Sequence, residues 1–153
     1  MTPAPDDSGV YVYLFDWPED AQARVGALGT VRLPAGRYAY VGSARRGLAA
    51  RLARHARKRK PRRWHLDYLA TRARPLGALT WPWAQGRECA LAAALAEGGA
   101  GRVHPPGFGA SDCRCPGHLL QLAEVGVARL TEGLARCVGL RPEWLDLTRK
   151  RAR

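Results

Sequence analysis

The stretch GVYVYLF at residues 9–15 decides the fold class, because β-branched, aromatic and aliphatic side chains follow its glycine without interruption. Residues of these types pack well on a pleated surface, so the stretch predicts a β-strand. Working outward along the chain, residues 31–33 and 37–41 predict two further strands, joined by the turn-forming sequence Pro-Ala-Gly. Residues 16–29 are expected to form a loop with a short helix. Together these segments predict a small, mostly antiparallel sheet.

A helical period follows these strands. Leu48, Leu52 and Ala56 recur at a spacing of four residues, which predicts a helix over residues 47–58. Such a helix presents its apolar side to the sheet and its polar side to solvent. The side chains expected on the polar side are Arg51, Arg54, His55 and Lys58.

The remaining elements are expected to flank the sheet. They are a helix over residues 64–72, a strand over 76–83, a helix over 87–97, a Gly/Pro-rich loop over 101–117 and a strand over 118–122. The rest of the chain predicts a strand and one or two helices, the last starting at Pro142, a favoured first-turn residue. The expected fold class is therefore α/β (α+β), with a small, mostly antiparallel central sheet flanked by helices. The expected division is a disordered N-terminus at 1–8, a domain at 9–122, a C-terminal extension packed on it at 123–148 and a basic tail at 149–153.

The length of 153 residues suits one domain. No apolar run approaches the roughly 20 residues that a membrane span needs. The first residues lack the basic and apolar parts of a secretory signal. We therefore expect a cytoplasmic protein without a membrane partner.

The charge is strongly positive and unevenly distributed. Lys and Arg total 25 against 13 acidic residues, a net charge of +12. Between Arg37 and Arg74 there are thirteen basic residues and one acid, Asp67. A concentrated excess of this kind indicates a surface for a polyanion, and Arg suits phosphate because it binds it through a planar fork. The alternative is a solvated, charged face.

Nucleic acid, with DNA favoured, is thus the expected partner. The basic run at residues 54–63 directly follows the predicted helix, as a surface that tracks phosphates requires. Trp64 is suited to stack on a base or, alternatively, to lie in the core. The residues expected to contact nucleic acid are Arg45, Arg46, Arg54, Arg57, Lys58, Arg59, Lys60, Arg62, Arg63, Trp64 and His65.

An ordered series of short motifs resembles the GIY-YIG nuclease superfamily. Gly9-Val10-Tyr11 resembles the first motif of that family, and Tyr40-Val41-Gly42 resembles the second. Further matching positions are Leu48 and Arg51, on the helix where members carry an essential Arg, His55, where members have Tyr or His, and Glu88, where the family has its metal-binding Glu. The resemblance implies a GIY-YIG nuclease-like fold.

A closer resemblance is to a branch known as domain of unknown function 123, over about residues 9–120. Its members occur alone or attached to endonuclease III-type repair enzymes, so the resemblance also implies a repair-protein partner. The matching segments are Gly42-Ser43-Ala44, Gly47-Leu48, Arg54-His55, Trp64-His65-Leu66-Asp67-Tyr68, Glu88-Cys89, and Phe108-Gly109 through His118.

The resemblance implies hydrolysis of phosphodiester bonds, assisted by one Mg²⁺ or Mn²⁺ held by Glu88. Arg51 would stabilise the charge of the phosphate in the transition state. The general base would be Tyr11, Tyr40 or His55. Of these, His55 is the best matched, because the ordinary pKa of imidazole is close to neutrality whereas that of Tyr is about 10.

Each of these positions also has a structural interpretation. Tyr11 and Tyr40 alternate with apolar residues, as core tyrosines on a strand do. Arg51 and His55 also fit a solvated helix face, and Glu88 fits a first-turn acid favoured by the helix dipole.

Three functions follow from these alternatives. The first is a metal-dependent DNA endonuclease of GIY-YIG type, with a place in DNA repair. The second is a non-catalytic nucleic-acid-binding module with the same fold. The chain contains no Asn, the residue that the family has after its metal-binding Glu, and Ser43 stands where repair-type members carry Lys. Asp112 is a candidate replacement for that Asn. The third is an interaction domain stabilised by zinc.

The zinc alternative comes from the cysteines, which lie at positions 89, 113, 115 and 137. In a chain without a secretory signal they indicate reduced thiols or a metal site rather than disulfides. Cys113, Cys115 and His118 lie within six residues, and zinc would take a fourth ligand such as Cys89 or His104. The alternative is a Gly/Pro-rich loop with buried thiols and a hydrogen-bonded His.

Overall fold

A computed structural model describes residues 7–58, 60–61, 65–97, 101–104, 107–108, 117–123 and 126–148. Its main sheet has six strands in the order β6-β7-β4-β1-β5-β8, and each neighbouring pair is antiparallel. The strands of this sheet are β1 (Gly9–Trp17), β4 (Gly36–Ala44), β5 (Arg74–Trp81), β6 (Gly101–Val103), β7 (Leu119–Leu122) and β8 (Glu143–Asp146). A separate hairpin pairs β2 (Ala21–Arg24) with β3 (Thr30–Leu33).

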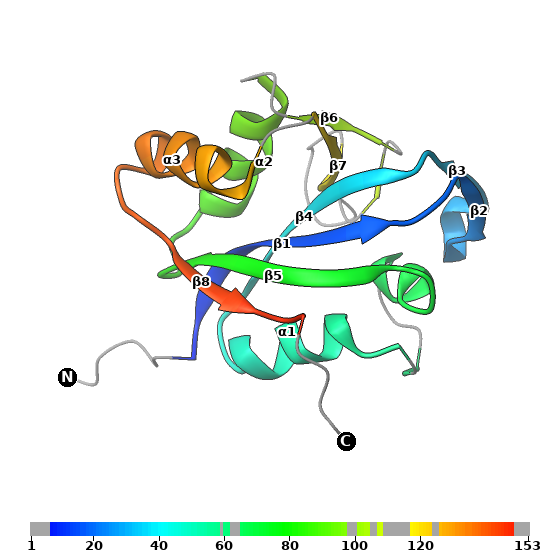
Figure 1. The fold of residues 1–153 in the computed structure, drawn as a ribbon. Coiled ribbons are helices and arrows are strands. Elements are labelled where there is room, and N and C mark those ends of the chain that lie inside the picture. Colours follow the sequence, from blue (N-terminus) through cyan, green and yellow to red (C-terminus); the bar gives the residue numbers. More distant parts are fainter. Residues whose placement is uncertain are drawn as a thin grey trace.

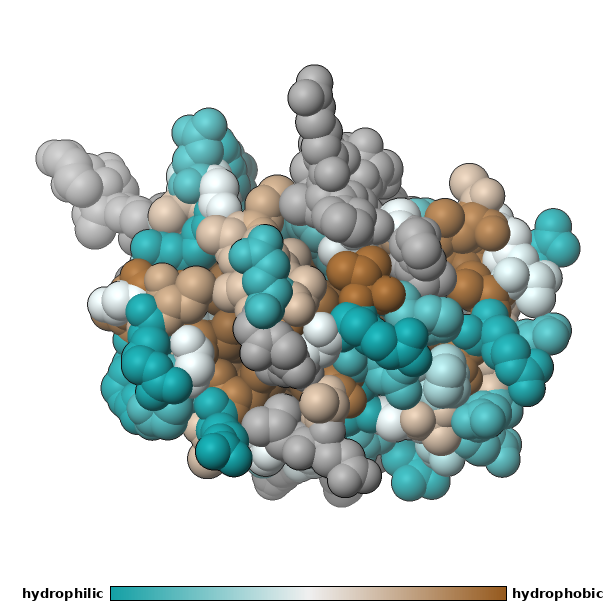
Figure 2. All heavy atoms as spheres, turned by 90° about the horizontal axis from the view of Figure 1, so that it is seen from above, coloured by the Kyte–Doolittle hydropathy of each residue, from teal (hydrophilic) through white to brown (hydrophobic). Residues whose placement is uncertain are grey.

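Helices cover both faces of the sheet, with α2 and α3 on one side and α1 on the other (Figure 1). The helices are α1 (Leu48–Ala56), α2 (Arg87–Glu97) and α3 (Val127–Val138), with short 3₁₀-helices η1 (Gly26–Leu28) and η2 (His65–Leu69). On the side of α2 and α3, hydrophilic side chains interrupt the hydrophobic patches of the surface (Figure 2). This architecture confirms the α+β class and the mostly antiparallel sheet.

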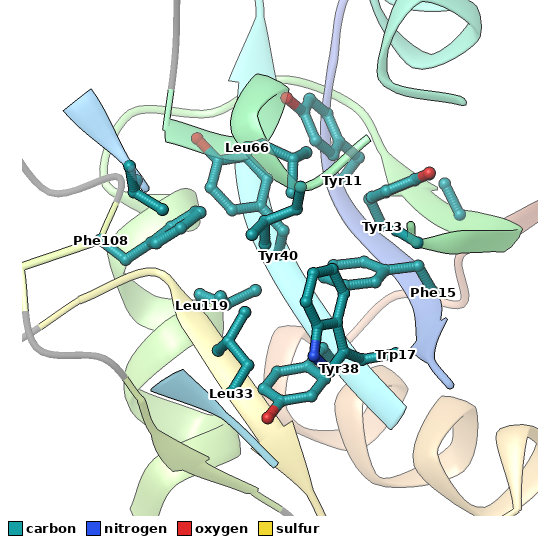
Figure 3. Close-up of a cluster of buried hydrophobic side chains, with 14 of the residues drawn as sticks. Tyr11, Tyr13, Phe15, Trp17, Leu33, Tyr38, Tyr40, Leu66, Phe108 and Leu119 are labelled. Carbon is teal, nitrogen blue, oxygen red and sulfur yellow. The ribbon is translucent and has the colours of Figure 1, made fainter. Parts of the chain in front are cut away.

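The central strand β1 is buried on both faces, which explains why its sequence is apolar and aromatic throughout. Successive side chains of a strand point to opposite faces, so the side chains of β1 pack in two hydrophobic cores, one on each face of the sheet. Val10, Val12 and Leu14 pack in the core that includes α2 and α3. Tyr11 and Tyr13 belong to the core that includes α1, together with further aromatic residues (Figure 3).

Four expected elements differ from the structure. Residues 101–103, expected to lie in a Gly/Pro-rich loop, form the strand β6, which pairs with β7. Residues 16–29 continue β1 to Trp17 and then form β2 and η1, where a loop with a helix was expected. Of the helix expected at 64–72, the described part is η2, a single 3₁₀ segment, and Trp64 lies outside the described residues.

The helix expected to start at Pro142 is wrong, because Glu143–Asp146 forms the strand β8. The ladder to β5 pairs Gly77 with Asp146 and Leu79 with Trp144. The indole of Trp144 lies directly over Gly77, where any Cβ atom would collide with it. Tertiary pairing on an open sheet edge therefore outweighs the local preference of Pro for a helix start.

No helix within the described part of the chain is long and apolar enough to span a membrane.

Candidate catalytic site

Three tyrosines and His55 form the centre of the site, on the α1 face of the sheet. The antiparallel register places Tyr13 opposite Tyr40 and Tyr11 opposite Gly42. The ring centroid of His55 lies 5.6 Å from that of Tyr11, 5.5 Å from that of Tyr13 and 5.8 Å from that of Tyr40. The hydroxyl of Tyr11 is 2.7 Å from His55 Nε2. The hydroxyls of Tyr11 and Tyr40 lie at the same end of this cluster, and that of Tyr38 lies at the other end (Figure 3).

His55 is in the core and not on the solvated face of α1 where it was expected. It is 4% exposed, and Leu52 of the same helix is fully buried. Positions 48, 52 and 55 are related by steps of four and three residues, so they form one stripe along a helix. His55 thus occupies the third position of the apolar stripe.

Burial sets the protonation of this pair. It lowers the pKa of His55 to about 3, and the charge of Lys60 acts in the same direction. Burial, and the neighbouring Tyr40, raise the pKa of Tyr11 well above 10, whereas Arg51 acts to lower it. At neutral pH the imidazole is therefore uncharged and the Tyr11 hydroxyl is protonated, and the histidine tautomer sets which of the two donates in their hydrogen bond.

The low pKa of His55 predicts a pH-dependent stability. Its folded-state pKa of about 3 lies below its ordinary value of 6.5, so the unfolded chain binds the extra proton first as the pH falls. The stabilisation is complete above pH 6.5 and is lost progressively toward pH 3, with a slope approaching about 1.4 kcal/mol per pH unit. Replacing His55→Gln keeps a hydrogen-bond acceptor for Tyr11 but removes the titration. Urea unfolding between pH 7.5 and 4.5 is expected to show a shallower slope for this variant, and equal slopes would contradict the assignment.

Gly42 makes the position of Tyr11 possible. A Cβ atom at residue 42 would lie 2.5 Å from the Tyr11 hydroxyl oxygen and 2.6 Å from the ring carbon that carries it. The ring of Tyr11 therefore lies across its cross-strand partner, which has no side chain. This contact is the physical reason for the Gly in the Tyr-Val-Gly sequence.

Replacing Gly42→Ala is expected to displace Tyr11 and to lower the free energy of unfolding by roughly 1–3 kcal/mol, as overpacking does. Gly133 in α3 has nothing within 4 Å of a Cβ position, so it provides a matched control. Gly133→Ala is expected to stabilise by roughly 0.5–1 kcal/mol. Both values follow from urea unfolding curves, and a neutral Gly42→Ala change would show that Tyr11 is not held against residue 42.

Glu88 lies in the first turn of α2 and is held through both carboxylate oxygens. The Ser43 hydroxyl donates to Oε1 at 2.7 Å, and His118 Nδ1 lies 3.0 Å from Oε2. Burial acts to raise the pKa of Glu88, but the hydrogen bonds from His118 and Ser43 outweigh it, so the pKa is lowered. The side chain of Glu88 remains 31% exposed. It is thus an ionised, oriented carboxylate that solvent reaches.

Arg51 joins the two groups of residues. Its guanidinium donates to the backbone oxygen of Ser43 at 2.6 Å, next to the carboxylate of Glu88. Its charge acts on both Tyr11 and Glu88. The structure therefore brings Tyr11, Tyr40, Arg51, His55 and Glu88 together around the ends of β1, β4 and α2.

Several of the basic residues expected at a nucleic-acid surface have partners within the fold. Arg54 donates to the buried carboxylate of Asp67 at 2.8 Å and to Pro61 O at 2.7 Å. Lys60 Nζ donates to Arg54 O at 2.5 Å and to His55 O at 2.9 Å, and its burial lowers its pKa to about 8. These side chains close the C-terminal end of α1.

The other expected contacts lie nearer the surface. Arg45, Arg46, Arg57 and Lys58 are exposed, although Lys58 also donates to Ala73 O at 3.3 Å. The Arg45 guanidinium lies 4.2 Å from the ring centroid of Trp83, and His65 packs edge-on against Phe108 at 5.3 Å. The expected contacts that fall outside the described residues are Arg59, Arg62, Arg63 and Trp64.

Sequence reasoning missed Tyr13, the contacts of Ser43 and His118 with Glu88, and the Arg54–Asp67 ion pair. The alternation of β1 was a usable signal for Tyr13, because it shares a face with Tyr11. Ser43 and His118 are 45 and 30 positions away from Glu88, so only the folded sheet brings them to it.

The expected zinc ligands are only partly described. Cys113 and Cys115 lie outside the described residues, as does Asp112. His118 is 2% exposed, and its Nε2 lies 4.0 Å from Cys89 Sγ. Within the described ranges, no three His, Cys, Asp or Glu side chains are arranged to hold a metal ion.

An open pocket of about 560 Å³ lies at the other end of β1 and β4. Its lining includes Trp17, Gly36, Arg37 and Arg74 but none of the tyrosine, arginine or glutamate residues of the candidate site. The pocket and the candidate site are therefore separate features.

The fold and the site define a small α+β domain with a tyrosine–histidine pair beside an arginine and an oriented carboxylate. The chain belongs to the family described as domain of unknown function DUF123, whose model matches residues 10–138. No curated protein and no solved structure gives a significant match to the chain.

Proposed function

We propose that the protein is a metal-dependent DNA endonuclease of GIY-YIG type that hydrolyses phosphodiester bonds, acting in the cytoplasm and in DNA repair. The observation that carries the proposal is the convergence of Tyr11, His55, Arg51 and Glu88 from one strand and two helices. Phosphodiester hydrolysis requires a proton acceptor for water, a positive charge for the phosphate and a site that stabilises the leaving oxygen. The cluster offers one group for each of these requirements.

The Tyr11–His55 pair supports the role of proton acceptor. In the His55 tautomer that is protonated at Nδ1, water attacks phosphorus as its proton passes to the Tyr11 oxygen and the Tyr11 proton passes to His55 Nε2 along the 2.7 Å hydrogen bond. The P–O bond to the leaving oxygen breaks, and its electron pair stays on that oxygen. The low pKa of His55 opposes this transfer in the ligand-free protein. A bound phosphate brings negative charge next to the cluster, which raises the pKa of a neighbouring imidazole.

Arg51 supports the role of phosphate ligand. Arg51 is only partly buried. Its positive charge acts to lower the pKa of both the Tyr11 hydroxyl and the Glu88 carboxyl. A planar guanidinium binds two phosphate oxygens at once and stabilises the charge that develops on them.

Glu88 fits a hard divalent cation. Mg²⁺ binds to one or two carboxylates and completes its shell with water and substrate phosphate, so one ionised, partly exposed carboxylate is sufficient. The chemistry that a bound Mg²⁺ or Mn²⁺ supplies is stabilisation of the negative charge on the phosphate and on the leaving oxygen. Ser43 and His118 fix the orientation of the carboxylate without blocking it, because each oxygen has a second lone pair.

A second candidate function is a nucleic-acid-binding module without catalysis. It is favoured by the specific observation that both oxygens of Glu88 already accept hydrogen bonds inside the protein. In that case the cluster is a structural network, and the exposed cations at Arg45, Arg46, Arg57 and Lys58 carry the binding.

One set of assays separates the two functions. Supercoiled plasmid and fork, flap and single-stranded oligonucleotides are incubated with Mg²⁺, and binding to the same substrates is measured from 50 to 200 mM salt, conditions in which phosphate contacts give a steep loss of affinity. Salt-sensitive binding with Mg²⁺-dependent cleavage supports the endonuclease. Salt-sensitive binding without cleavage of any substrate supports the binding module, and binding that ignores salt contradicts both.

A further inference from the structure

We infer that the open pocket at the end of β1 is a second anion site, which takes a phosphate monoester from a free nucleotide or from the 5′ end of a nucleic-acid strand. The pocket has a volume of about 560 Å³, a size typical of ligand sites. It lies where β1 ends beside the β2–β3 hairpin (Figure 1). No residue of the candidate catalytic site lines it, so the inference goes beyond the proposed nuclease chemistry.

Two arginines and an aspartate form a row across three strands at this pocket. Asp16 of β1 is opposite Arg37 of β4 on one side and opposite Arg74 of β5 on the other. Residues that are directly opposite on neighbouring strands have their side chains on the same face of the sheet. The row contains two positive charges and one negative charge, so it favours an anion.

The ion pair with Asp16 fixes Arg37 without using all of its donors. Arg37 Nε donates to Asp16 Oδ1 at 2.9 Å, and Nη2 donates to Oδ2 at 3.3 Å. A guanidinium has more N–H groups than these two hydrogen bonds use. The two side chains are 36% and 35% exposed, so a ligand in the pocket reaches the remaining donors.

Arg74 is available to a ligand. It is exposed, and within the described part of the chain it makes no hydrogen bond or ion pair. An anion therefore gains a contact with Arg74 without breaking one inside the protein. A guanidinium binds two oxygens at once. Two guanidinium groups, one on each side of the row, therefore suit the three terminal oxygens of a phosphate monoester better than the two of a carboxylate.

The rest of the lining suits the sugar that carries the phosphate. The Oε1 atom of Gln121 accepts a hydrogen bond from Arg102 at 2.8 Å, so its Nε2 remains a donor. Gly36 leaves room for this amide, because a Cβ atom at residue 36 would lie only 3.2 Å from Gln121 Nε2. Trp17 and Leu122 add apolar surface. A lining with a few polar groups among apolar ones is typical of small-molecule sites.

The test measures binding to the full chain by calorimetry in a buffer without divalent cations. The probes are a nucleoside 5′-monophosphate and the same nucleoside without its phosphate. Wild type is expected to bind the monophosphate with a dissociation constant below about 1 mM, and the nucleoside at least roughly tenfold more weakly. Arg74→Ala is expected to bind the monophosphate at least roughly tenfold more weakly than wild type.

Two further arginine variants serve as controls. Arg136 is exposed on α3 and does not line the pocket, so Arg136→Ala removes the same charge and is expected to bind the monophosphate like wild type. Arg51→Ala reports on binding at the candidate catalytic site and is also expected to bind it like wild type. Ala123→Trp adds bulk at an exposed position of the lining and is expected to weaken binding without a change of charge.

Oligonucleotides with and without a 5′-phosphate distinguish the two sources of the phosphate. A preference for the phosphorylated strand that is lost in Arg74→Ala assigns the pocket to strand ends. Equal binding of the two strands, with monophosphate binding retained, assigns it to free nucleotides.

The inference is overturned if wild type binds the monophosphate no better than the nucleoside, or if Arg74→Ala and Ala123→Trp both bind it as tightly as wild type. A loss of binding in Arg51→Ala that Arg74→Ala does not share also overturns it, because the nucleotide then lies at the candidate catalytic site. Binding is measured without a divalent cation, so the result stands whether or not the chain is a nuclease.

Discussion

Arg51→Ala is expected to lower the rate of DNA cleavage by roughly 100- to 1,000-fold, the effect of removing one donor that stabilises developing charge. The guanidinium of Arg51 contacts Ser43 and acts electrostatically on both Tyr11 and Glu88. Binding of DNA is expected to change much less than the rate, since the exposed cations remain. Single-turnover cleavage with saturating protein measures the rate directly.

Arg57→Ala provides the matched control for this variant. Arg57 is exposed and immediately follows α1, so its loss is expected to weaken DNA binding and to lower the salt dependence by about one phosphate contact. The single-turnover rate is expected to stay near that of wild type. If Arg51→Ala weakens DNA binding but leaves the single-turnover rate unchanged, as Arg57→Ala is expected to do, the assignment of Arg51 to the transition state is wrong.

Asp67→Ala is expected to lower the free energy of unfolding by about 3–5 kcal/mol, the cost of leaving one partner of a buried ion pair uncompensated. The carboxylate of Asp67 has no exposed surface, and Arg54 is 18% exposed. Its removal leaves Arg54 and Lys60 near the end of α1 without their acidic neighbour. In a chain of this length, the melting temperature is expected to fall by roughly 10 °C.

The exposed pair Arg37–Asp16 is the control for this prediction. Its side chains are 36% and 35% exposed, so Asp16→Ala is expected to cost no more than about 1 kcal/mol. Thermal unfolding by circular dichroism compares the two variants. Equal and small effects would mean that Asp67 does not anchor Arg54, and Arg54 would then return to the set of candidate DNA contacts.

The sequence predicted those elements whose local residue pattern is typical of one kind of secondary structure. The apolar run at residues 9–15 was predicted to be a strand and lies within β1, and the Ala/Leu-rich segment of α2 was predicted with its observed bounds, Arg87–Glu97. The segment after Pro142 was predicted wrongly, because its pairing partners in β5 are 63 to 69 residues away. A local propensity does not encode such an edge contact.

The sequence identified candidate residues that the structure brings together, but it did not predict the environment of His55. Tyr11, Tyr40, Arg51, His55 and Glu88 converge, yet the sequence placed His55 on the polar side of α1. From sequence alone, a polar residue on a helix is expected to face solvent unless a buried partner for it is known. The partners of His55 are aromatic rings from β1 and β4. His55 was expected to be the best-matched base because the ordinary pKa of imidazole is near neutrality. Burial lowers that pKa and makes His55 a weaker base.

Glu88 and its neighbours are proposed to form a catalytic centre. The most direct test is single-turnover cleavage of supercoiled plasmid by wild type and Glu88→Gln over a range of Mg²⁺ concentrations, with DNA affinity measured on the same preparations. Wild type is expected to cleave in a Mg²⁺-dependent way, and Glu88→Gln is expected to be at least roughly 100-fold slower, with unchanged or slightly tighter DNA binding. Equal rates for the two proteins, or tight binding by wild type with no cleavage at any Mg²⁺ concentration, would contradict the proposal.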